Sequence, residues 1–200
     1  MTKRMLIFSV LIICVLVIFK FCGNKPEQDK VAEQKPVPLN ISQNSGTFNE
    51  SFSKLLHSYF SLKDAFINAD ISKVNSAAIE IIQHADSLDI SELKGDTSGM
   101  ISETAKYFAA TISGSAKIVA GENKTEDKLR EFNMITDALW SLTRTVKFEG
   151  QKVYYHFCPT ALDNTGGYWL SDKIDAGNPY THEKDKSCSQ VNDSLDYSKR

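Results

Sequence analysis

Residues 48–66 read FNESFSKLLHSYFSLKDAF, and this stretch indicates the fold class. Its large apolar side chains recur at steps of three and four residues, which places them along one face of an α-helix. These side chains are Phe48, Phe52, Leu55, Tyr59, Leu62 and Phe66. Thr47 and Glu50 have the spacing of a capping box, so we expect Thr47 to cap the helix and the helix to close near Ala69.

Three further stretches, 71–88, 101–119 and 129–146, repeat the same periodicity. We expect Asp70 to cap the first of them, Gly121 to end the second and Thr125 to cap the third. Four amphipathic helices joined by short links predict an all-α fold, an antiparallel four-helix bundle. The further side chains expected in its core are Ile71, Val74, Ala78, Ile81, Ala85, Leu88, Ile101, Ala105, Phe108, Ile112, Ala116, Val119, Leu129, Phe132, Ile135, Leu139, Leu142 and Val146.

The pattern changes after Gly150. Residues 153–158, VYYHFC, alternate with period two, which predicts a short strand with His156 and Cys158 on the same face. A turn rich in Asn and Gly follows at 163–167, and the rest of the chain has no clear period. We therefore expect a short β or irregular cap at the C-terminal end of a bundle domain that spans 47–200.

The N-terminal segment has the layout of an export signal. Lys3 and Arg4 precede an uncharged apolar run at 5–19, so residues 1–22 are expected to be a signal or anchor segment. Residues 23–46 are polar and contain three prolines, which predicts a disordered tether. The positive charges before the run predict a membrane-anchored domain on the periplasmic side of the cell envelope. Cys22 directly after the run is a candidate lipidation site; an uncleaved anchor and a cleaved signal are the alternatives.

Composition excludes some classes of function. The chain is 42% hydrophobic and 24% charged with a net charge of −2, values of a globular domain without the positive charge that nucleic-acid binding needs. Outside the predicted signal segment the cysteines are Cys158 and Cys188. In an oxidising compartment they pair most simply as a disulfide; a reduced metal-binding pair and two unpaired thiols are the alternatives.

No catalytic motif is complete, so we predict that the protein is not an enzyme. The chain has no Cys-x-x-Cys, and the His182-Glu183 pair lacks the second histidine of a zinc-protease helix because Lys186 occupies that place. His57 and His84 lie on separate predicted helices and neither belongs to a Glu-x-x-His motif. The sequence therefore predicts no di-metal carboxylate site in the bundle.

Residues 154–180, YYHFCPTALDNTGGYWLSDKIDAGNPY, resemble the signature of an uncharacterised bacterial domain family. That family occurs alone in small exported proteins and is also appended to periplasmic adaptor subunits of copper/silver efflux pumps. The resemblance extends from about Phe48 to Leu195. It implies a helical domain with a C-terminal cap, a periplasmic accessory role near soft-metal handling, an efflux adaptor as partner, and no catalytic activity.

The chain departs from the family in its methionines. The family has Met directly after the Cys-Pro pair and again shortly before the second Cys, whereas this chain has Thr160, Asp185 and Lys186 there. Thioether ligands select Cu(I) or Ag(I), so their loss weakens the case for soft-metal binding. Two hypotheses stay open. One is a Cu(I) or Ag(I) site; the other is a non-catalytic structural or interaction domain stapled by a Cys158–Cys188 disulfide. The candidate ligands for the metal site are Cys158, Cys188, His156 and His182.

Overall fold

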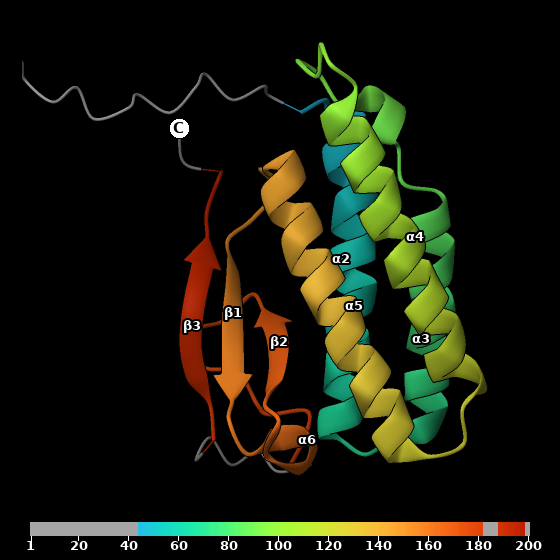
Figure 1. Cartoon of the computed structure of the whole chain (residues 1–200), viewed down its shortest axis with the longest axis vertical. Coiled ribbons are helices and arrows are strands. Elements are labelled where there is room, and N and C mark those ends of the chain that lie inside the picture. The colour runs from blue at the N-terminus through green and yellow to red at the C-terminus, as the bar shows by residue number, and fades with distance from the viewer. Residues whose placement is uncertain (1–43, 182–187, 199–200) are drawn as a thin grey trace, which may run out of the picture. The chain divides into compact units, whose positions relative to one another are not determined.

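The computed structural model describes residues 44–181 and 188–198, which belong to one compact unit spanning residues 41–200 (Figure 1). The predicted anchor 1–22, the candidate lipidation site Cys22, nearly all of the tether, and His182 lie outside the described residues. The described chain is mostly helical, with a small antiparallel sheet at its C-terminal end. No described helix combines the length and hydropathy that a membrane span requires.

The elements follow the chain order seen in Figure 1. The helical part contains α2 (Gly46–Ile67), α3 (Ile71–Asp86), the short 3-10 helix η1 (Ile90–Glu92), α4 (Met100–Gly121) and α5 (Thr125–Val146). The C-terminal part contains β1 (Val153–Cys158), the one-turn helix α6 (Ala161–Asn164), β2 (Gly167–Ser171) and β3 (Gln190–Leu195).

The long helices pack in chain order, α2 against α3, α3 against α4 and α4 against α5. The predicted apolar stripes of α2 and α5 are buried throughout. The predicted stripes of α3 and α4 are buried except at Ile71 and Ile101, which stand in the first turns of their helices, and at Phe108, which is partly buried. The rings of Tyr59 and Phe132 stack 5.3 Å apart and join α2 to α5 across the core.

Two of the three predicted helix caps are wrong. Asp70 caps α3 as expected, because its carboxylate accepts the backbone N–H of Lys73. The helix α2 is capped by Ser45 instead of Thr47: the Ser45 hydroxyl accepts the N–H of Phe48 at 3.1 Å, and the helix begins at Gly46. Thr125 is the first residue of α5, and its N-cap position is held by Lys124 without a side-chain hydrogen bond.

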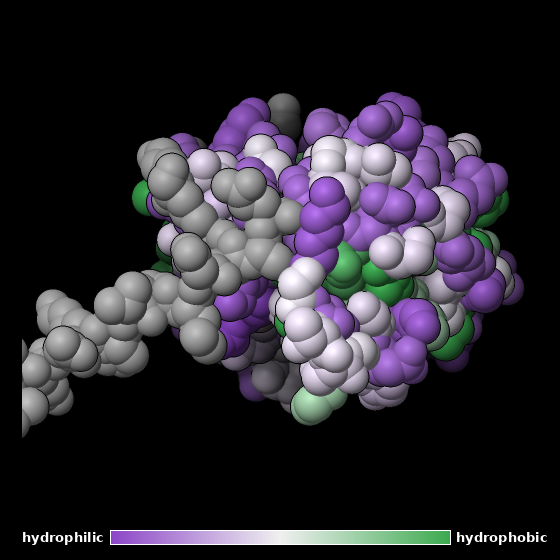
Figure 2. All heavy atoms as spheres, turned by 90° about the horizontal axis from the view of Figure 1, so that it is seen from above, coloured by the Kyte–Doolittle hydropathy of each residue, from purple (hydrophilic) through white to green (hydrophobic). Residues whose placement is uncertain are grey.

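The chain before α2 is fixed to the far end of α5. Asn44, in the stretch expected to be a tether, is buried, and its amide donates to the carbonyl of Val146 at 2.9 Å. Figure 2 views the domain end-on from the side where α2 and α4 begin. The coloured surface there is largely hydrophilic, and hydrophobic residues form small separate areas (Figure 2).

The sheet has the strand order β2-β1-β3, and both pairings are antiparallel. The strand predicted at 153–158 is confirmed as β1, the central strand. Strand β2 lies next to the helices and β3 lies farthest from them (Figure 1). The sheet therefore contacts the helices mainly through β2, its edge strand on that side. This contact positions the C-terminal corner of the domain.

Candidate functional site: the disulfide-linked corner

The free edge of β2 is hydrogen-bonded to helix side chains. The N–H of Tyr168 donates to the Asn133 amide oxygen at 2.8 Å, and the N–H of Leu170 donates to the Tyr59 hydroxyl at 3.0 Å. An edge strand normally leaves such donors unpaired. Here α5 and α2 satisfy them, so the position of the sheet is set by specific polar contacts.

The Tyr59 hydroxyl belongs to a directional chain of hydrogen bonds. Thr136 donates its only hydroxyl proton to the carbonyl of Phe132 at 2.9 Å, so its oxygen accepts the proton of Tyr59 at 2.7 Å. Tyr59 in turn accepts from Leu170. Burial raises the pKa of the Tyr59 hydroxyl, which is consistent with its role as a neutral donor.

A disulfide joins the end of β1 to the segment before β3. The sulfurs of Cys158 and Cys188 are bonded, and their Cα atoms lie 5.1 Å apart. Cys158 is fully buried and Cys188 is partly buried. The Thr160 hydroxyl lies 3.1 Å from the sulfur of Cys188 and 3.4 Å from that of Cys158. In this bonded state neither sulfur is a thiolate, which is the form that binds metal.

The region around Cys188 is held by Asn178. The Asn178 side chain is fully buried; its amide donates to the carbonyl of Cys188 at 3.0 Å and its oxygen accepts the N–H of Tyr180 at 2.9 Å. The Tyr180 hydroxyl then donates to the carbonyl of Tyr168 at 2.6 Å. The loop between β2 and β3 is thus tied both to the disulfide and to the strand that contacts the helices.

His156 is buried on the same strand as Cys158, two residues before it. Its Nε2–H donates to the carbonyl of Lys173 at 3.1 Å, because a carbonyl can only accept. Its Nδ1 lies 3.4 Å from the Ser189 hydroxyl, and its ring stacks on Trp169 with centroids 5.2 Å apart. Burial lowers the pKa of His156, which favours the neutral ring. Both nitrogens face protein groups, which leaves the ring in a structural position.

Of the four candidate metal ligands, the described chain brings Cys158 and Cys188 together, as a disulfide. His156 is engaged on both nitrogens, and His182 lies outside the described residues. Within 44–181 and 188–198, no three His, Cys, Asp or Glu groups stand where they could hold a metal ion.

A row of stacked rings covers the other face of β1 and β2. Trp140 on α5 stacks on Tyr155 at 4.7 Å, Tyr155 on Tyr168 at 4.8 Å, and Tyr168 on Phe157 at 4.6 Å. We call these four residues the aromatic ladder. The two tyrosines and Phe157 are half-buried, so ring surface remains open to a partner. The ladder was not predicted from the sequence, because Trp140 is separated from the strands in the chain and lies outside the predicted helix stripe.

Two contacts fix the aromatic ladder. The Tyr155 hydroxyl donates to the carboxylate of Asp137 at 2.9 Å, and burial raises the pKa of that carboxyl group. At the end of the ladder formed by Phe157, the ring lies against Gly166, whose φ is +89°. A Cβ built there would lie 2.6 Å from a ring carbon of Phe157, so only glycine fits both the backbone and the ring.

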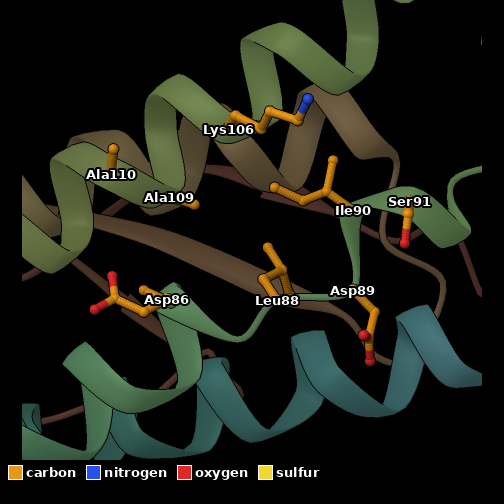
Figure 3. Close-up of a pocket in the computed structure, with 9 residues that line it drawn as sticks. Asp86, Leu88, Asp89, Ile90, Ser91, Lys106, Ala109 and Ala110 are labelled. Atoms are coloured by element: carbon orange, nitrogen blue, oxygen red, sulfur yellow. The ribbon is translucent and has the colours of Figure 1, made fainter.

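A hollow of about 390 Å³ lies away from this corner, between the end of α3, η1 and α4 (Figure 3). Leu88 and Ile90 project toward α4, whereas the Asp86 and Asp89 carboxylates point to opposite sides (Figure 3). Lys106 at its border is paired with Glu103 at 2.7 Å. The residues that line the hollow include no histidine or cysteine.

The part of the chain that matches a known protein family covers the helices and not the corner. Residues 55–150 match a family described as a protein of unknown function (DUF3347). The match begins inside α2 and ends after α5, before β1. No curated protein and no solved structure matches the chain.

Proposed function

We propose that this protein is a membrane-tethered, non-catalytic accessory domain on the periplasmic side of the bacterial cell envelope. In this proposal the disulfide-linked corner contacts a partner, such as an efflux adaptor, through the aromatic ladder. The observation that carries the proposal is the bond between Cys158 and Cys188, because disulfides persist in oxidising compartments and are rare in the cytosol. The disulfide uses the two thiols that a soft-metal site would need. The half-buried rings of the aromatic ladder are then the surface of the corner that can bind a partner protein.

Membrane attachment is the part of the proposal that rests on the sequence. The apolar run after Lys3 and Arg4, followed by Cys22, supports export and tethering. Metabolic labelling with a palmitate analogue tests the lipidated form, and we expect the label to be lost in Cys22→Ala. Label that survives this substitution excludes Cys22 as the lipidated residue. Recovery of the intact chain from the cytosol contradicts the whole localisation.

We further propose that α2 to α5 form an antiparallel four-helix bundle. Contacts between consecutive helices support it, and so does the stack of Tyr59 on Phe132, which brings the first and last of these helices together. An experimental structure tests this arrangement. A layout in which α2 and α5 are separated by another helix would contradict it.

Binding through the aromatic ladder is testable with a purified periplasmic adaptor subunit of a copper/silver efflux pump. Aromatic residues are enriched where protein interfaces carry most of their binding energy. We expect Phe157→Ala and Tyr168→Ala to weaken binding by at least about fivefold, since truncation of an interface anchor costs more than about 1 kcal/mol. Tyr107→Ala is the matched control, because Tyr107 on α4 is 68% exposed and lies outside the ladder. Equal binding by all three variants would exclude the ladder as the interface.

Soft-metal handling is the competing function, and the partial exposure of Cys188 favours it because a reductant can reach that sulfur. A thiol count on protein purified without oxidant or reductant separates the two functions. The interaction function predicts no free thiol at Cys158 or Cys188. Anaerobic Cu(I) titration against a chelator completes the test. Tight stoichiometric binding that disappears in Cys158→Ser/Cys188→Ser would replace our proposal with the metal function.

A further inference from the structure

A groove between α2 and α3 brings together two histidines that are far apart in the sequence. His57 on α2 and His84 on α3 both line a hollow of about 270 Å³. The Ser58 hydroxyl, adjacent to His57 in the chain, lies 2.6 Å from Nδ1 of His84. The groove lies on the helices, on residues distinct from the disulfide and the aromatic ladder. From the sequence the two histidines were expected on separate helices with no di-metal carboxylate site, and their shared groove was not predicted.

Hydrogen bonds set the proton position on both imidazole rings. Nδ1 of His57 lies 3.1 Å from the carbonyl of Ser53, and a carbonyl only accepts, so Nδ1 carries the proton. Ser58 donates its one hydroxyl proton to the carbonyl of Lys54 at 2.9 Å, so its oxygen accepts the Nδ1–H of His84. In the neutral form, both rings therefore leave Nε2 as the nitrogen with a free lone pair. This is the arrangement of a metal-ligating histidine, whose other nitrogen donates to an oriented acceptor.

The charges that line the groove favour a cation. Glu50 is paired with Lys54 at 2.9 Å, which cancels one charge of each sign. Glu80 lines the same hollow and is exposed, and its carboxylate makes no ion pair or hydrogen bond within the part of the chain that the structure describes. Glu80 and His84 are four residues apart on one helix, which places them on the same face. The groove thus carries two imidazoles and one unpaired carboxylate.

We propose that His57 and His84 bind a divalent transition-metal ion through their Nε2 atoms, with the Glu80 carboxylate adding negative charge to the groove. Imidazole donors suit Zn²⁺, Cu²⁺ and Ni²⁺. No three His, Cys, Asp or Glu groups among the described residues stand where they could hold a metal ion, so the two histidines are the protein ligands. Water completes the coordination, which leaves an open position on the ion.

The test is Zn²⁺ titration of the full chain, without an affinity tag, in mild detergent and with the Cys158–Cys188 bond intact. We expect one Zn²⁺ per chain, and at least about tenfold weaker binding in His57→Ala and in His84→Ala, because even loss of a group that only orients a ligand costs about 10–100-fold. Ser58→Ala tests that orienting role and should weaken binding about tenfold. Glu92→Ala is the matched control, because this exposed carboxylate lies outside the groove, and it should bind as the unmodified chain does.

Electron paramagnetic resonance of bound Cu²⁺ gives a readout that a change in folding does not imitate. The spectrum of the unmodified chain should show hyperfine coupling to two nitrogen ligands, and each histidine variant should lose one of them. Failure of the unmodified chain to bind Zn²⁺ overturns the proposal. Binding that is unchanged in His57→Ala/His84→Ala, or lost in Glu92→Ala, also overturns it. None of these results bears on the proposed interaction function, since that function depends on the corner.

Discussion

The helical body, α2 to α5, and the C-terminal corner, β1 to β3 with the loop between β2 and β3, are held together by different interactions. In the body, apolar side chains from four helices are buried against one another. The corner instead relies on a disulfide, stacked rings and buried polar groups such as His156 and Asn178. Apolar burial is spread over many replaceable contacts, whereas each polar pair depends on its own partner. The two regions should therefore respond differently to single substitutions.

The largest expected effect is a charge placed in the helical core. Ile81 on α3 is fully buried, so Ile81→Asp should lower the free energy of unfolding by more than about 4 kcal/mol, because an unpaired carboxylate is costly to bury. Ile79 lies on the same helix and is 49% exposed. Ile79→Asp is therefore the control, with an expected loss of about 0.5 kcal/mol. Urea unfolding measures both, and equal losses would mean that the stripe of α3 does not face the core.

The body was predictable because its signal is local. The apolar residues from Phe48 to Phe66 recur every three or four positions within one segment, and they are buried as expected. The caps were harder, because Ser45 and Thr47 are both acceptable N-cap residues. Which of the two caps α2 depends on how Asn44 is fixed to the end of α5, a contact between residues about one hundred positions apart.

The next largest effect concerns the disulfide. Cys158 and Cys188 are 30 residues apart in the sequence, and closing a loop of this length stabilises the fold by about 3–4 kcal/mol through the unfolded chain. Cys158→Ser/Cys188→Ser should show a loss of this size in urea unfolding. The unmodified chain should show the same loss after reduction. A loss below about 1 kcal/mol in both would mean that the corner is held by its noncovalent contacts alone.

The corner was only partly predictable because its pairings are not periodic. The period-two pattern along 153–158 predicted the strand β1, with His156 and Cys158 on one face, and β1 is found there. A single sequence does not predict that the Leu170 N–H donates to the Tyr59 hydroxyl, or that Trp140 stacks on Tyr155, because each pair joins separate elements. Such contacts are set by the docking of β2 against the helices.

A smaller effect tests the hydrogen bonds that join the two regions. Tyr59→Phe keeps the ring in the core but removes the hydroxyl that accepts the Leu170 N–H, and a buried donor left unpaired costs about 1–3 kcal/mol. We expect this loss in urea unfolding, together with faster hydrogen exchange at the Leu170 amide. Tyr107→Phe on exposed α4 surface should change neither quantity. Unchanged exchange in Tyr59→Phe would show that the edge of β2 is held in another way.

The smallest effect is a pH dependence confined to the corner. Burial, with the nearby Lys63 ammonium, lowers the pKa of His156 below its ordinary value of 6.5, although the hydrogen bond to Lys173 acts the other way. As the pH falls below about 6.5, the unfolded chain binds this proton before the folded chain does. The contribution of neutral His156 to the free energy of unfolding is thus fully present above that pH. It declines below that pH by at most about 1.4 kcal/mol per pH unit.

His156→Gln isolates this contribution, because glutamine does not titrate. Urea unfolding at pH 7.5 and at pH 5.5 should show a larger loss of stability in the unmodified chain than in His156→Gln, whatever the absolute stability of the variant. The Asp137 carboxyl acts in the opposite direction, since burial raises its pKa and protonation at low pH then favours the folded state. Asp137 is present in both proteins, so its contribution cancels in the difference. An equal loss in the two proteins would mean that His156 is not kept neutral by its burial, and that the corner tolerates a charge where the core of the helices does not.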